Sequence, residues 1–120
     1  MHSDLLAQIL ADLNGTHATI EASTLISMTG LALASSLPPD VDEDRVSAIS
    51  AAVLSLGKST LRTLRYGDVE QVLITAKYGT VLITPAGEQA FIAVLVKPDA
   101  RLDLITAAIQ QTVVQIKEYR

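Results

Sequence analysis

The spacing of apolar residues along the chain predicts three helices. Leucine and isoleucine recur every three or four residues at the start, which predicts a helix over 3–14 with Asn14-Gly15 as its left-handed stop. A longer run with the same spacing predicts a second helix over about 42–65. A third helix is predicted over 102–119, because apolar residues again share one helical face there.

Five other segments are rich in β-branched residues and are separated by turn signals, which predicts strands. They are 20–28, 31–35, 69–76, 80–84 and 90–96. The last is apolar at every position from Phe91 to Val96, a pattern typical of a strand covered on both faces. Short connections favour antiparallel neighbours.

These elements predict a single α/β (α+β) domain over residues 1–120, in the order α-β-β-α-β-β-β-α. We expect one five-stranded antiparallel sheet. The long helix should lie on one face, and the two terminal helices should lie on the other.

The long helix has matching signals at its two ends. Four carboxylates lie within residues 40–44, where the positive end of the helix dipole favours them, and Asp42 is the expected N-cap. Lys58, Arg62 and Arg65 lie near the other end, where the dipole favours cations. The acidic run lacks the calcium-loop pattern, so we interpret it as a cap rather than a cation site.

A helical wheel divides the long helix into three faces. The most apolar face should lie on the sheet, and it holds Val46, Ile49, Val53, Leu56, Thr60 and Leu64. A second stripe holds Ser50, Leu54, Gly57 and Leu61. The face left for water holds Ala48, Ala51, Ser55, Lys58 and Arg62. No charge occurs over residues 46–57, although a helix facing water normally carries Lys and Glu outward. We therefore expect a second chain to cover this helix, most simply a second copy across a twofold axis.

The composition excludes several classes of function. Cysteine is absent, which excludes disulfides and thiol chemistry. The formal net charge is −4 and aromatic residues make up 3% of the chain, so we expect no nucleic acid partner. The longest uncharged run, 22–39, is too rich in serine and proline to span a bilayer, and the first residues lack the basic segment of a signal peptide. We expect no membrane contact and a cytoplasmic location.

No active site emerges from the sequence. Gly57-Lys58-Ser59 matches the tail of a phosphate-binding loop, but the earlier glycine of that motif is replaced by Ala52, and the segment continues a predicted helix. An alternative, nucleotide hydrolysis through Lys58 and Ser59, would require that loop. His2 and His17 are the only histidines, and we interpret them as exposed residues of the terminus and a turn. We expect no catalytic residue, no metal and no cofactor.

Several segments become informative when they are taken together. They are residues 22–27, 30–35, 50–57, 72–74, 93–95 and 98–104. In this order and spacing they make the chain resemble the Roadblock family, the dynein light-chain Roadblock type that also includes bacterial gliding-motility GTPase regulators. The resemblance covers nearly the whole chain.

The resemblance implies a homodimer in which two copies pair through the long helix and the strand after it, joining their sheets. The interface implied for this chain consists of Ser50, Leu54, Gly57, Leu61, Val72 and Ile74. The paired helices would form a platform on which prokaryotic relatives bind Ras-like small GTPases. That platform consists here of Ala48, Ala51, Ser55, Lys58 and Arg62.

What the resemblance implies about function is a non-catalytic regulatory or adaptor module that modulates the nucleotide cycle of a Ras-like small GTPase. Some relatives stimulate GTP hydrolysis, whereas others only scaffold. The alternative is therefore a structural scaffold subunit that assembles a kinase or motor complex without regulating a GTPase.

Overall fold

The computed structural model describes residues 2–119, with side chains described over 4–119. The predicted order of helices and strands is confirmed. The helices are α1 (His2–Thr16), α2 (Glu43–Leu64) and α3 (Leu102–Glu118). The strands are β1 (Ile20–Ser27), β2 (Ala32–Ser36), β3 (Val72–Ala76), β4 (Gly79–Pro85) and β5 (Ala90–Val96). None of the helices in this described part is both long and apolar enough to cross a bilayer.

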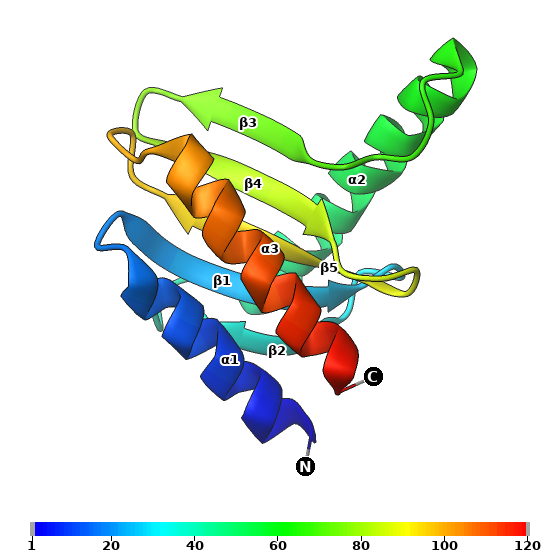
Figure 1. Ribbon diagram of the computed structural model, residues 1–120. Helices are drawn as coiled ribbons and strands as arrows, with labels where there is room; N and C mark the ends of the chain where they lie inside the picture. Colours follow the sequence, from blue (N-terminus) through cyan, green and yellow to red (C-terminus); the bar gives the residue numbers. More distant parts are fainter. Residues whose placement is uncertain (1, 120) are drawn as a thin grey trace.

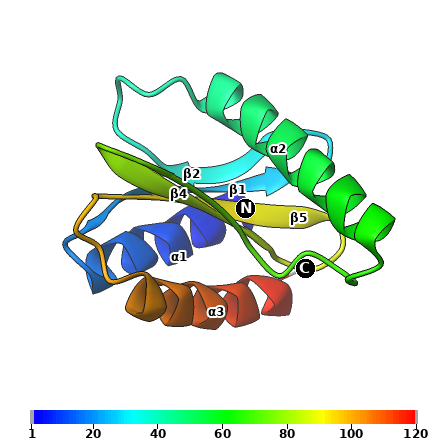
Figure 2. The same ribbon diagram turned by 90° about the horizontal axis from the view of Figure 1, so that it is seen from above.

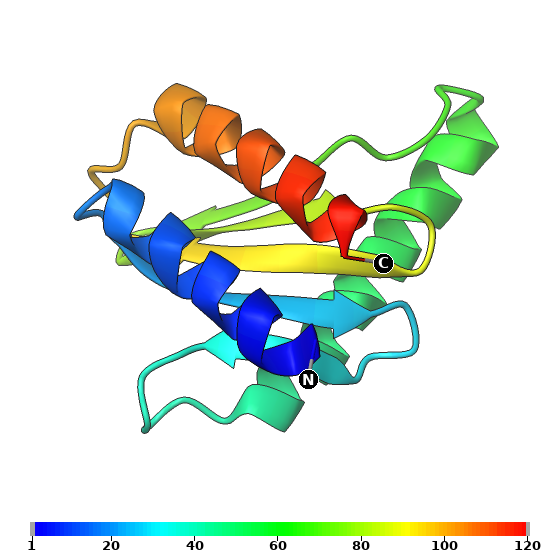
Figure 3. The ribbon, with the colours of Figure 1, turned by 60° about the horizontal axis from the view of Figure 1, so that its bottom comes forward.

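One antiparallel sheet organises the molecule, and its strand order is β2-β1-β5-β4-β3. Figure 1 shows β2 and β3 at the two edges of this sheet. Seen from above, α2 covers one face of the sheet, and α1 and α3 cover the other (Figure 2). The two terminal helices lie side by side across their face (Figure 3). The predicted three-layer arrangement is therefore confirmed.

Strand β5 lies at the centre of the sheet and separates two apolar cores. Ile92 and Val94 belong to the core under α1 and α3, together with Leu10, Ile105 and Ile109. Phe91 and Ala93 belong to the core under α2, together with Ile26, Leu54 and Ile83. Successive side chains of a strand point to opposite faces, so a central strand between two helical layers is apolar at every position. The doubly covered strand predicted from the sequence is confirmed.

The caps of α2 follow the predicted chemistry. Asp42 accepts a hydrogen bond through Oδ1 from the backbone N–H of Arg45, at 3.1 Å, which satisfies one free donor of the first turn. At the other end, Arg65 adopts the left-handed conformation with φ 59°. Its backbone N–H bonds to the carbonyl of Arg62 and closes the last turn.

The predicted stop of the first helix is wrong. Helix α1 continues to Thr16, and Gly15 is not among the described residues with positive φ. The side chain of Asn14 instead joins three elements. It donates from Nδ2 to the carbonyl of Ser36, at 3.1 Å, and accepts from Oγ of Ser23 at 2.7 Å. An amide that can both donate and accept suits this link between α1, β1 and β2 better than a helix stop does.

The predicted start of the third strand is also wrong. Strand β3 begins at Val72 rather than at Val69, because only residues from Val72 onward pair with β4. Val69 is nevertheless buried, in the core under α2. The apolar signal at this position therefore reports burial in a loop rather than strand pairing.

We predict that Asn14→Ala lowers the free energy of unfolding by about 1–3 kcal/mol, because it leaves the fully buried hydroxyl of Ser23 without its short hydrogen bond. Urea denaturation followed by circular dichroism measures the change. The exposed Gln115→Ala on α3 is the control and should stay near the wild-type value. A loss for Asn14→Ala no larger than that of the control would contradict the role given to Asn14.

Candidate interaction site

Helix α2 lies on the sheet with a different face from the one predicted. Three members of the face expected to contact the sheet are exposed instead: Ile49 by 55%, Leu56 by 71% and Leu64 by 52%. The buried residues of the helix are Ser47, Ser50 and Leu54. The predicted assignment of the most apolar face to the sheet is therefore wrong.

Small residues explain this orientation of α2. A side chain added at Gly57 would place its Cβ 3.4 Å from Cγ2 of Val72, so the helix approaches the sheet closely there. Near the other end, a Cβ at Gly30, in the β1–β2 turn, would lie 3.5 Å from Cβ of Ala51. Serine, alanine and glycine permit such close packing, whereas a wheel ranked by hydrophobicity assigns the sheet to the larger apolar residues.

The six residues implied as a dimer interface therefore differ in how deeply they are buried. Ser50 and Leu54 are buried within their own chain, with Leu54 only 1% exposed. Gly57, Leu61 and Val72 are half-buried between α2 and the sheet, and Leu61 and Val72 pack against the core there. Of the six, Ile74 alone is exposed. Most of the predicted interface stripe is thus occupied within a single chain.

An uncovered apolar surface lies next to that stripe. We call it the α2–β3 surface, and it consists of the exposed side chains Ile49, Leu56, Leu64 and Ile74. Within residues 2–119, strand β3 pairs with β4 alone, so its outer edge is a row of unpaired backbone groups. The close approach of Gly57 to Val72 places the middle of α2 beside the start of this edge. An apolar helix face beside an open strand edge is suited to contact with another chain.

The residues implied as a partner platform also divide into two groups. Ala48, Ser55 and Arg62 are exposed on α2. Ala51 is half-buried under the β1–β2 turn at Gly30. Lys58 is half-buried as well, and its Nζ lies 3.5 Å from Sδ of Met28. The exposed members form a weakly charged strip along the helix, about 100° around it from Leu56.

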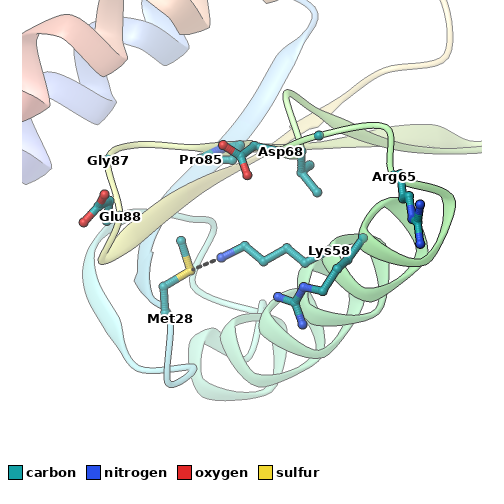
Figure 4. A pocket seen from close by; sticks show the side chains of 10 residues that line it. Met28, Lys58, Arg65, Asp68, Pro85, Gly87 and Glu88 are labelled. Carbon is teal, nitrogen blue, oxygen red and sulfur yellow. Dashed lines mark hydrogen bonds between the residues drawn. The ribbon is translucent and has the colours of Figure 1, made fainter.

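Lys58 also lines a pocket beside the C-terminal half of α2 (Figure 4). The cavity has a volume of about 650 Å³. Its walls come from the end of α2, the loop before β3, the β1–β2 turn and the β4–β5 turn. The residues that line it are Met28, Lys58, Arg62, Arg65, Gly67, Asp68, Val69, Pro85, Gly87 and Glu88.

The Gly57-Lys58-Ser59 motif and His17 lie in separate parts of the described chain. Gly57-Lys58-Ser59 lies within α2, where backbone N–H groups bond along the helix and not to a phosphate. His17 is half-buried, with Nδ1 3.0 Å from Oγ1 of Thr16, while the side chain of His2 lies outside the described residues. Among the side chains described over 4–119, no three of His, Asp or Glu gather as a metal site requires.

Sequence comparison identifies one family over most of the chain. A family model described as the Roadblock/LC7 domain matches residues 6–96. Two uncharacterized proteins of Methanocaldococcus jannaschii, MJ1340 and MJ0310, are each 30% identical to the chain over 113 residues. Each match covers 94% of this chain and 97% of the relative.

Structure comparison finds the same fold in solved structures. The Roadblock/LC7 domain from Streptomyces avermitilis has a TM-score of 0.88 at 24% identity, covering 94% of this chain and 95% of that one. MglB of Myxococcus xanthus has a TM-score of 0.88 at 10% identity, covering 95% and 93%. The gliding protein MglB from Thermus thermophilus has a TM-score of 0.85 at 12% identity, covering 98% and 89%.

We predict opposite outcomes for two neighbouring substitutions in α2. Leu54→Asp should abolish cooperative folding, because it places a carboxylate in the apolar core without a partner. Leu56→Asp should keep helical content and a cooperative thermal transition, because that side chain is outside the chain's own core. Circular dichroism of the soluble fraction compares the two. A folded Leu54→Asp or an unfolded Leu56→Asp would contradict the orientation of the helix.

Proposed function

The chain belongs to the Roadblock/LC7 domain family, and from this premise we propose that it is a homodimeric, non-catalytic module that binds a Ras-like small GTPase and modulates its nucleotide cycle. The observation that carries the proposal is the outward side of α2. Ile49, Leu56 and Leu64 are large, apolar and exposed there, on a helix that already has its own core below it.

A second copy is the occupant that suits the α2–β3 surface best. Two β3 edges brought together antiparallel would continue the sheet and satisfy their unpaired backbone groups. The same twofold arrangement would bring the sides of the two α2 helices that carry Ile49 and Leu56 into contact. Helices without charge over residues 46–57 pack closely in such a pair. The interface proposed here therefore keeps the long helix and β3 but uses Ile49, Leu56 and Leu64 in place of Ser50 and Leu54.

Self-association also has support from a relative of the same fold. One MglB structure, with a TM-score of 0.88 and 13% identity to this chain, is described as having a tetrameric arrangement. That arrangement belongs to that protein, and the proposal for this chain rests on its own uncovered surface.

The proposed action on the GTPase is conformational. A dimer would present two outer strips of α2, each with Ala48, Ser55 and Arg62, as one continuous platform. A platform that binds one arrangement of the partner's switch loops more tightly shifts the partner toward that arrangement by its differential affinity. Such a mechanism needs no reacting group from this chain. The Roadblock resemblance, which includes bacterial gliding-motility GTPase regulators, supports a GTPase as the partner, and the gliding protein MglB shares the fold.

We predict that the wild-type chain has about twice its 12.7 kDa chain mass in solution and that Leu56→Asp has the mass of a single chain. The twofold axis would place the new carboxylate in the interface twice, each time without a partner. Light scattering coupled to gel filtration measures both masses. Leu104→Asp, the same change at an exposed leucine of α3, should stay dimeric. A monomeric wild type, or a dimeric Leu56→Asp, would contradict the proposed interface.

We predict that a Ras-like GTPase from the same genome binds the chain in only one of its two nucleotide states and hydrolyses GTP at a different rate in its presence. Ser55→Arg should weaken the complex, because it inserts a long charged side chain into the platform without touching the core. Gln110→Arg, which is exposed on α3, is the matched control. Gel filtration with each nucleotide and a phosphate-release assay measure binding and turnover.

The possible outcomes separate the proposal from its alternative. A stable complex that is indifferent to nucleotide and leaves turnover unchanged would identify a scaffold and overturn the regulatory role. Absence of any complex would overturn GTPase binding, while the dimer would stand or fall on the mass measurement alone.

A further inference from the structure

The pocket beside α2 is polar on two opposed walls and is formed by one chain alone. Its helical wall carries Lys58, Arg62 and Arg65, and its loop walls carry Asp68 and Glu88. Figure 4 shows Lys58 extending from α2 toward Met28, across the space beneath Asp68. In the same view the side chain of Arg65 points away from the pocket. Leu56 and Lys58 are two residues apart, hence about 200° apart around the helix. The pocket and the α2–β3 surface therefore lie on opposite flanks of α2.

The cations of the helical wall form no ion pair within the part of the chain that the structure describes. None of the ion pairs formed within the described residues includes Lys58, Arg62 or Arg65, since the pair found there joins Arg101 to Asp103. Lys58 is half-buried, and among the described side chains its Nζ reaches the thioether of Met28 alone, at 3.5 Å. A thioether is a weak acceptor and does not neutralise an ammonium group. An anion placed between Lys58 and Arg62 would gain charge-assisted hydrogen bonds that the free pocket leaves unmade.

The loop walls restrict what that anion can be attached to. Asp68 and Glu88 are acceptors and carry negative charge, so they repel a second anionic group and favour hydroxyl or amino donors. Val69, Pro85 and the stem of Met28 supply apolar contact between the two poles. A volume of about 650 Å³ lies within the range of small-molecule sites, about 300–1,000 Å³.

We propose that this pocket binds a small phosphate monoester whose uncharged body carries hydroxyl or amino groups, as in a nucleoside monophosphate or a sugar phosphate. The phosphate lies against Lys58 and Arg62, and the donors of the body face Asp68 and Glu88. All of these residues belong to one chain, so the site does not depend on the proposed dimer, and Arg62 is shared with the platform proposed for a GTPase.

The test is a calorimetric titration of the full chain with AMP at physiological salt. Saturable binding with one site per chain is expected. Adenosine, which lacks the phosphate, should not bind measurably, and inorganic phosphate, which lacks the body, should bind at least tenfold more weakly. Ribose 5-phosphate distinguishes a nucleoside from a sugar as the body of the ligand. If it binds as tightly as AMP does, the sugar hydroxyls make the contacts to the loop walls.

Two variants link that binding to the pocket. Lys58→Met keeps the aliphatic stem beside Met28 and removes the charge, so it should fold normally and weaken AMP at least tenfold. Lys97→Met, at an exposed position outside the pocket, should bind as the wild type does. Glu88→Gln should weaken AMP but leave inorganic phosphate unchanged.

Three results would overturn the proposal. The first is the absence of saturable heat with both AMP and ribose 5-phosphate. The second is equal loss of affinity in the Lys58→Met and Lys97→Met variants, which would indicate general charge screening. The third is equal affinity for AMP and inorganic phosphate, which would remove the loop walls from recognition.

Discussion

The structure depends on one constraint: α2 is apolar on two sides and has its own core for only one of them. Leu54 and the small residues around it contact the sheet, and this contact closes the core that contains Phe91 and Ile83. The larger residues Ile49, Leu56 and Leu64 face outward. Burial of such side chains stabilises a protein by about 1.5–3 kcal/mol each relative to exposure. A single chain does not gain this stabilisation, because these three side chains face solvent. A second copy that buried them would provide it.

The two edge strands of the sheet, β2 and β3, differ in how well the rest of the chain covers them, and the less covered strand is β3. Strand β2 is partly covered, because Asn14 of α1 bonds to its last residue and its side chains are largely half-buried. Strand β3 has no such cover on its outer edge, and most of its side chains are exposed. Proteins generally shield open edges with charge, proline or a covering element. None of these devices occurs within Val72–Ala76.

Much of the fold could be predicted from the sequence, because its signals are local or periodic. The uninterrupted apolar run of β5 identified the central strand, and Asp42 identified the start of α2. The orientation of α2 could not be predicted, because it depends on how closely small residues such as Gly57 approach a sheet that lies far away in sequence. The link through Asn14 was missed for a similar reason, since its partners on β1 and β2 meet it only after folding. The pocket around Lys58 combines three separated stretches of the chain, at Met28, 58–69 and 85–88, and the motif at that lysine resembles a phosphate-binding loop where the chain forms a helix.

Whether a second chain covers the side of α2 that carries Ile49 and Leu56 is tested most directly by measuring which methyl groups are exposed to solvent in the unmodified chain. A soluble paramagnetic probe relaxes exposed methyl groups, and Leu31 provides an internal standard because it is 67% exposed and lies in the β1–β2 turn. Leu56 is 71% exposed in the single chain, so both leucines would relax alike if the outer side of α2 faced solvent. If a second chain covers α2, Leu56 and Ile49 are protected while Leu31 relaxes strongly. Equal relaxation of Leu31 and Leu56 at working concentration would contradict coverage by a second chain.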